Sequence, residues 1–182
     1  MTGDRDGPRV HLLATSVTPS RSSTRLGLHV AGLLGQAGIE VTVTDMGKAP
    51  ERWFAHPGAH LAHYPSAFLE LAAEIAGADA LIVAASVYSQ LPSGMQVVQI
   101  LADRNAGVLG GKTVWVIGCA GSAEGAARLE ILAELLRTNG ADVWSPPLGS
   151  VPGRTCPEAI ETRVAELSRL LWWDFASASV LV

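Results

Sequence analysis

The stretch Val10-His-Leu-Leu-Ala14 runs straight into Thr15-Ser-Val-Thr-Pro-Ser-Arg-Ser-Ser-Thr24, and together the two segments decide the fold. The first is a short apolar strand, and the second is a loop in which seven of ten residues carry a hydroxyl group. A helix is predicted immediately afterwards, with apolar side chains recurring on one face at Leu26, Val30, Leu33 and Leu34. A strand, a polar loop and a helix form the first unit of an α/β fold.

The hydroxyl-rich loop indicates an anion-binding site. In a parallel sheet, the passage from strand to helix offers free backbone N–H groups and the positive end of the helix dipole. Hydroxyl groups donate hydrogen bonds, and Arg21 would add a charge-assisted pair. The alternative is ordinary helix capping by Ser22 or Ser23. Because capping accounts for one or two hydroxyls but not seven, phosphate binding is the favoured interpretation.

Further strands follow along the chain. Residues Ile39–Thr44 alternate apolar and polar side chains, which predicts a strand at an edge or with one buried face. Residues Ala80–Ala85 and Thr113–Ile117 are unbroken apolar runs, typical of strands covered on both faces in the middle of a parallel sheet.

Helices are predicted between the strands. Three of them are expected to end at glycines in a left-handed conformation, Gly38, Gly77 and Gly140, and each of these glycines is followed within a few residues by a strand, the fifth strand coming after Gly140. A weaker helix is expected from Gly94 to about Ala102. Apolar positions at helical spacing mark three of the predicted helices: Phe68, Leu71, Ala72 and Ile75 in the second; Leu129, Leu132, Leu135 and Leu136 in the fourth; and Ile160, Val164, Leu167 and Leu171 in the last. The last helix opens with the capping-box pattern Thr155-Cys-Pro-Glu158.

This alternation predicts a single α/β domain over residues 1–182, with residues 1–8 disordered and residues 172–182 forming an apolar tail. Five strands joined by helices make right-handed crossovers, and an edge-like second strand suits a five-stranded parallel sheet in the order 2-1-3-4-5. Ligands of such sheets bind beyond the carboxyl ends of the strands, where the strand order reverses. Three loops should therefore form the site, those after Ala14, after Ala85 and after Ile117.

The second and third loops suit a flat ligand. Ser86-Val-Tyr-Ser89 offers the ring of Tyr88, and Pro92-Ser-Gly94 makes a turn with free amides. The small residues of Gly118-Cys-Ala-Gly-Ser122 let a ligand approach the backbone, and Ser122 is placed to cap the fourth helix. A phosphorylated ligand with a flat ring fits these loops; a flavin mononucleotide is one, and another nucleotide or a phosphosugar remains open.

Three stretches resemble the NADPH-dependent FMN reductase family, which has a flavodoxin-like fold and includes sulfonate-linked flavin reductases and some azo- and quinone reductases. Thr15–Thr24 stands at the family's phosphate loop. Ala78-Asp-Ala-Leu-Ile-Val-Ala-Ala-Ser-Val-Tyr88, with Ser93-Gly94, is similar to its most specific segment. Gly111–Ser122, with Asn139-Gly-Ala141, is similar to its third flavin loop.

The resemblance implies hydride transfer from NADPH or NADH to N5 of FMN, with reduced flavin passed to a partner monooxygenase. Azo- or quinone reduction with retained FMN, and a flavin-fold binding protein without turnover, are the alternatives. Thr15 and Thr18 stand where the family has Gly and Arg, so Arg21 is expected to supply the charge, and Ser86 replaces a common proline. No catalytic side chain is implied. The residues expected to bind the cofactor are Ser16, Thr18, Arg21, Ser22, Ser23, Thr24, Ser86, Val87, Tyr88, Ser89, Cys119, Ala120, Gly121 and Ser122.

Composition argues against several other classes of protein. A net charge of −4 and the lack of any basic run speak against nucleic-acid binding. No apolar stretch approaches the roughly 20 residues that span a bilayer. The polar start and the two cysteines, Cys119 and Cys156, favour a cytoplasmic protein with reduced thiols. Cys119 is expected to be a small buried thiol.

Two further features are not part of the predicted flavin site. His56, His60 and His63 are expected to be solvated rather than to bind a metal, since Pro57-Gly58 separates the first two. The apolar tail from Trp172-Trp173 either packs back on the last helix or lies in a subunit interface. We expect a homodimer or homotetramer.

Overall fold

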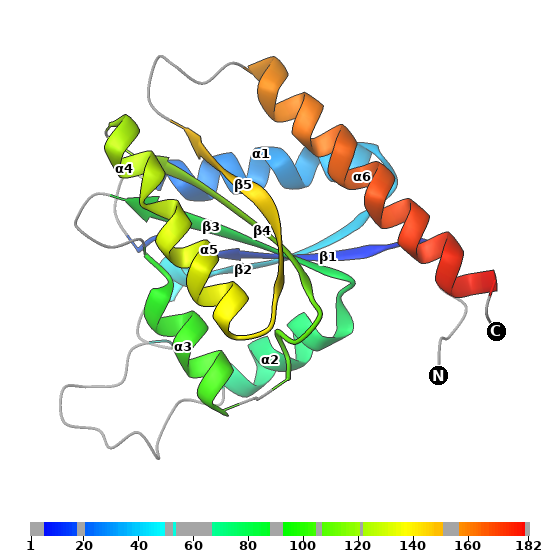
Figure 1. Ribbon diagram of the computed structural model, residues 1–182, viewed down its shortest axis with the longest axis horizontal. Coiled ribbons are helices and arrows are strands. Elements are labelled where there is room, and N and C mark those ends of the chain that lie inside the picture. Colours follow the sequence, from blue (N-terminus) through cyan, green and yellow to red (C-terminus); the bar gives the residue numbers. More distant parts are fainter. Residues whose placement is uncertain are drawn as a thin grey trace.

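A computed structural model shows a five-stranded parallel sheet in the order β2-β1-β3-β4-β5, with helices on both faces (Figure 1). It describes residues 6–17, 21–49, 53, 67–87, 93–104, 107–120, 122–150 and 157–180. The strands are β1 (Arg9–Ala14), β2 (Glu40–Asp45), β3 (Ala80–Val87), β4 (Thr113–Ala120) and β5 (Asp142–Ser150). The predicted flavodoxin-like topology and strand order are confirmed.

Two apolar layers hold the helices against the sheet. On one face lie α1 (Ser22–Gln36) and α6 (Pro157–Val180), and on the other α2 (Ala67–Gly77), α3 (Met95–Arg104), the short α4 (Ala123–Ala127) and α5 (Leu129–Thr138) (Figure 1). Alternate residues of each central strand enter opposite layers, as Leu12 and Leu13 of β1 do. The side chains are therefore buried on both faces of the sheet.

The central and edge strands differ as the sequence predicts. All eight residues of β3 are buried, and six of the eight in β4 are. By contrast, β2 lies at the edge of the sheet and buries none of its side chains fully. The alternation there is less strict than expected, because Val43 remains 42% exposed. The single-turn helix η1 (Met46–Lys48) follows β2 directly.

Helix ends follow the glycine prediction in two cases of three. Gly38 and Gly140 have φ angles of 79° and 86°, the left-handed conformation expected after a helix. Gly77 was wrongly expected to adopt it: it is the last residue of α2 and does not have a positive φ. The predicted fourth helix is in fact two helices, α4 and α5, which meet at Arg128.

Residues 172–180 continue helix α6 rather than leaving it. Trp172 packs back: its Nε1–H donates to the carbonyl of Ala37 at 3.1 Å, and its ring lies against Gly7 and Gly38. Trp173, the next residue, is 74% exposed. The end of α6 lies beyond the sheet (Figure 1).

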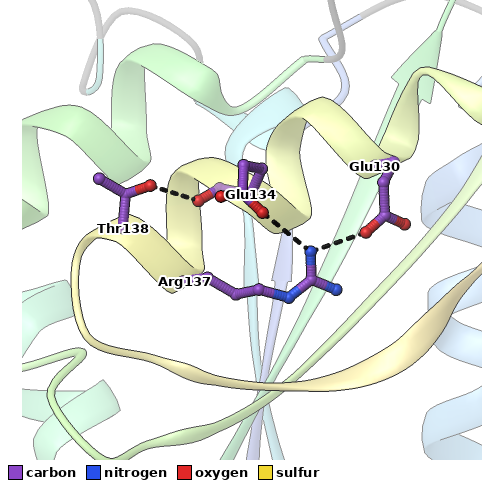
Figure 2. Close-up of polar contacts among 4 residues, drawn as sticks. All are labelled: Glu130, Glu134, Arg137 and Thr138. Carbon is purple, nitrogen blue, oxygen red and sulfur yellow. Dashed lines mark hydrogen bonds and ion pairs between the residues drawn. The ribbon is translucent and has the colours of Figure 1, made fainter.

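Polar side chains on α5 form a small surface cluster. The guanidinium of Arg137 donates to Glu130 at 2.7 Å and to Glu134 at 3.2 Å (Figure 2). The hydroxyl of Thr138 donates to the carbonyl of Glu134 at 2.8 Å. These contacts lie on the solvent side of α5, whose opposite face buries Leu129, Leu132, Ala133 and Leu136. Within the part of the chain that the structure describes, no helix has the length and apolar character needed to cross a membrane.

Candidate functional site

The carboxyl ends of the neighbouring strands β1, β3 and β4 lie side by side at the C-terminal end of the parallel sheet. The register pairs Ala14 with Ala84, Ser86 with Cys119, and Val87 with Ala120. The three predicted loops therefore leave the sheet next to one another, where the strand order reverses between β1 and β3. The topology assembles the loops that the sequence singled out.

The start of α1 has a backbone suited to an anion. Arg21 occupies the N-cap position with φ 46° and ψ 30°, a left-handed conformation, and the described residues provide no side-chain cap for the helix. Helical hydrogen bonding begins with the N–H of Arg25 donating to the carbonyl of Arg21 at 2.9 Å. The amides of Ser22, Ser23 and Thr24 precede that bond. A change of hand before a helix turns successive N–H groups toward one concave side, an arrangement that binds anions.

The hydroxyls of this segment have different partners. Ser23 is buried, and its Oγ lies 2.6 Å from Oγ of Ser86 on β3, which joins the first loop to the second. Ser22 is half-buried and accepts a long hydrogen bond of 3.4 Å from Arg25. Thr24 is 2% exposed, and its Oγ1 has no hydrogen-bond partner among the residues that the structure describes. Serine capping, the alternative to anion binding, is not what the helix uses.

Thr24 Oγ1 is the atom that fits a bound phosphate. An unpaired buried hydroxyl costs about 1–3 kcal/mol, so proteins pair nearly all of them. A phosphate on the first turn of α1 is a strong acceptor next to this donor.

A second group of hydrogen bonds shapes the loop after β3. The hydroxyl of Ser93 accepts from the amide of Ser86 at 2.8 Å and lies 2.8 Å from Oγ1 of Thr15. Thr15 in turn donates to the carbonyl of Ala84 through both its amide and its hydroxyl. Gly94 has φ 95°, and a Cβ there would lie 2.7 Å from Thr15 Cγ2. Ser93 and Gly94 are thus packed tightly against Thr15 of the first loop.

The sequence missed part of this arrangement. Thr15 and Ser93 were not among the predicted site residues, although Ser93 was recognised as part of a turn. Their roles depend on contacts between loops 78 residues apart, which no local pattern records.

The end of β4 carries small side chains, and the strand continues past Ile117, where the sequence placed the start of the third loop. Cys119 is half-buried rather than buried, and Ala120 is buried beside Val87. Ser122 caps α4, as predicted, because its Oγ accepts from the amide of Gly125 at 3.1 Å. A Cβ on Gly125 would lie 3.1 Å from Cβ of Ala120, so the helix starts close to the end of the strand.

The positive charge of Arg21 is paired with a carboxylate. Its guanidinium forms an ion pair with Asp45, at the end of β2, whose side chain is only 5% exposed. No pattern in the sequence points to Asp45. The charge expected to meet an anion is therefore compensated within the protein.

Four of the predicted site residues, Thr18, Tyr88, Ser89 and Gly121, lie outside the described residues, and so do His56, His60 and His63. The described ranges hold no group of three or more His, Cys, Asp or Glu side chains placed to bind a metal ion.

The sequence model for NADPH-dependent FMN reductase matches residues 8–151, the region that contains all three loops. This chain belongs to that family. The chain is therefore an NAD(P)H-dependent flavin oxidoreductase that uses FMN. The Thr24 hydroxyl at the start of α1, which has no partner among the described residues, fits the phosphate of that cofactor. A comparison with curated proteins finds no match to the sequence.

Solved structures share the fold of this family member at low identity. NADH:FMN oxidoreductase (EMOB) in its apo form superposes with a TM-score of 0.72 at 14% identity, over 90% of each chain. The flavoenzyme NAD(P)H:(acceptor) oxidoreductase FerB from Paracoccus denitrificans gives 0.67 at 18%, over 91% of this chain and 96% of FerB. A flavodoxin from Streptococcus pneumoniae TIGR4 gives 0.60 at 21%, over 90% of this chain and 97% of the flavodoxin.

Proposed function

We propose that this chain transfers a hydride from NADPH or NADH to FMN and releases reduced FMN to a partner monooxygenase. In the balanced reaction, one NAD(P)H, one proton and one FMN give NAD(P)⁺ and FMNH₂. When bound, FMN supplies the redox chemistry, so the protein must bind, orient and shield it. The proposal is carried by the unpaired, buried hydroxyl of Thr24 on the first turn of α1, inside the family match.

Each loop has a distinct role in this proposal. The amides of Ser22, Ser23 and Thr24, with the Thr24 hydroxyl, hold the phosphate, and Ser16 and Thr18 complete that loop. The segments Ser86–Ser89 and Cys119–Ser122 hold the ring, with Tyr88 beside it. The Ser23–Ser86 hydrogen bond fixes the distance between the phosphate seat and the ring seat. Backbone amides at the ring's polar edge would stabilise charge that develops on reduction.

The direct test is oxidation of NADPH or NADH by the purified protein with added FMN. Steady turnover with FMN as a substrate is expected. Ping-pong kinetics with a quinone at a flavin that stays bound would instead show an azo- or quinone reductase. FMN binding without consumption of NAD(P)H would show a binding protein.

Substitution at Thr24 tests the phosphate seat. Thr24→Val keeps the shape and removes the donor, so the Kd for FMN should rise about tenfold while that for riboflavin, which lacks the phosphate, stays constant. Thr162→Val is the matched control, because that hydroxyl is exposed on α6 and donates to the carbonyl of Glu158 in its own helix. Equal effects on both flavins would argue against a phosphate at Thr24.

The chain is also proposed to form a homo-oligomer, supported by the exposed Trp173 at the end of α6. Trp173→Ser removes this apolar surface while leaving the packed Trp172 in place. Light scattering should show a smaller assembly for the variant than for the unmodified chain. An unchanged mass would mean that α6 does not contribute to an interface.

A further inference from the structure

The ion pair between Arg21 and Asp45 lies at the edge of the proposed phosphate seat. Arg21 belongs to the loop between β1 and α1, and Asp45 ends the neighbouring strand β2. The arginine side chain is 33% exposed and that of Asp45 only 5%. Asp45 is therefore the buried anchor of the pair, and Arg21 is its partly exposed partner.

A second contact fixes the carboxylate of Asp45. Its Oδ1 accepts from the amide of Gly47 at 3.0 Å, while Oδ2 faces Arg21. A Cβ on Gly47 would lie 3.4 Å from Cζ and Nε of Arg21 and 2.8 Å from the carbonyl of Ser16. The guanidinium of Arg21 thus lies against Gly47, which has no side chain, and close to the carbonyl of Ser16 in its own loop. This pair is built into the junction of two loops, unlike a loose surface pair.

The charges of Arg21 and Asp45 affect how strongly the start of α1 binds an anion. Arg21 is the N-cap of α1, directly before the first helical turn, so its side chain is close enough in the sequence to serve a phosphate bound there. Asp45 offsets that positive charge and places a negative one beside a phosphate that is itself negative. The seat then relies on N–H groups, hydroxyls and the helix dipole, without a net cationic side chain from Arg21.

Resting on the function proposed above, we propose that Asp45 is a positioning residue that withholds Arg21 from the FMN phosphate and so keeps FMN exchangeable. An exchangeable flavin suits an enzyme that uses FMN as a substrate and releases it reduced. The residue sets affinity through the phosphate alone and does not touch the ring.

The test compares FMN with riboflavin. Asp45→Asn keeps the side-chain shape and an oxygen for the Gly47 amide but frees Arg21. The Kd for FMN should fall about tenfold at low salt, with riboflavin unchanged, because one charge-assisted contact is gained. The gain should shrink at 0.5 M salt and vanish in the double variant Arg21→Gln/Asp45→Asn.

Two further comparisons keep the test independent of Asp45→Asn alone. The double variant Arg21→Gln/Asp45→Asn should differ from the unmodified chain by less than about twofold in the Kd for FMN, since it removes both charges of a compensated pair. Glu40→Gln is the matched control: it removes one carboxylate from the same strand, where Glu40 pairs with Arg9 at the far end of β2. It should leave both flavins unaffected.

The outcomes separate this inference from the function on which it rests. A wild-type chain that binds neither flavin contradicts the proposed function. A wild-type chain that prefers FMN to riboflavin, but whose Asp45→Asn variant binds FMN more weakly, overturns the inference alone. A tenfold loss of FMN affinity in the double variant Arg21→Gln/Asp45→Asn would do the same, since that variant leaves no unpaired carboxylate and the loss would show that Arg21 already serves the phosphate.

Discussion

Gly118 of β4 lies where the neighbouring strand β3 leaves no room for a side chain. It pairs with Ala85 in the centre of the sheet, and a Cβ there would press into the Ala85 carbonyl oxygen and lie 2.9 Å from Leu129 Cδ2. Gly118→Ala should therefore lower the free energy of unfolding by about 3 kcal/mol or more, measured by urea denaturation. The backbone of β3 would have to move, and that carries Ser86 with it.

Gly32→Ala is the control for this prediction. Gly32 is exposed in α1, and a Cβ there meets nothing within 4 Å. Because alanine is a better helix former than glycine, this variant should be more stable by about 1 kcal/mol. If both alanine variants changed stability alike, the close packing at Gly118 would not matter.

At single residues, the sequence predicts which groups a loop contains but not how they are paired in the fold. The hydroxyl-rich loop was recognisable, because seven hydroxyls beside a strand exceed what a helix cap needs. The ion pair between Arg21 and Asp45 could not be predicted from the sequence, because it joins residues 24 positions apart on different elements. A local pattern shows which donors a loop contains but not which of them the rest of the fold has already used.

At the level of elements, hydrophobic periodicity predicted nearly all of the fold. The apolar runs of β3 and β4 lie in the middle of the sheet, and the alternating β2 lies at its edge, because burial on one or two faces dictates those patterns. Boundaries were harder to predict. Gly77 remains helical, and a break at Arg128 separates α4 from α5 without a glycine or proline to signal it.

The ion-pair cluster on α5 predicts a small, salt-sensitive contribution to stability. The hydrogen bond that Arg137 donates to Glu130 raises the pKa of Arg137, and Glu134 adds to this shift. Both carboxylates are exposed and Arg137 is partly so, and water and salt therefore screen the pairs. Arg137→Met should cost less than about 1 kcal/mol of unfolding free energy at low salt, and less still in 1 M NaCl. Thermal unfolding at the two salt concentrations measures it.

Arg169→Met on α6 serves as the comparison, because among the described residues that guanidinium contacts a backbone carbonyl and no carboxylate. Its effect should not depend on salt. A loss at Arg137 that stays the same in 1 M NaCl would point to packing of the side-chain stem rather than to charge.

At the level of the whole molecule, the topology joins what the sequence keeps apart. The order of the strands brings residues 15, 23, 86 and 93 into one hydrogen-bonded group at the carboxyl edge. The same sheet buries a histidine away from that edge. His11 of β1 is fully buried between β2 and α2; its Nδ1 lies 2.9 Å from Oγ1 of Thr42 and its Nε2 is 3.8 Å from Glu74.

Burial of His11 makes the stability of the whole fold depend on pH. Removal from water lowers the pKa of His11 below 6.5, and the nearby Glu74 carboxylate opposes this shift only in part. The unfolded chain then binds a proton more readily than the folded one as pH falls through 6.5. The free energy of unfolding contributed by a neutral His11 is therefore present above that pH and is lost on acidification.

His11→Asn should reduce this loss, because an amide keeps a polar partner for Thr42 and does not titrate. Melting temperatures measured from pH 7.5 to pH 5 should fall less steeply for this variant than for the unmodified chain, even if its stability at pH 7.5 is lower. His29→Asn, at an exposed position on α1, removes a histidine without changing a buried site and should leave the slope as it was. If both variants gave the slope of the unmodified chain, protonation of His11 would not be what links acid to unfolding, and the carboxylates would have to account for it.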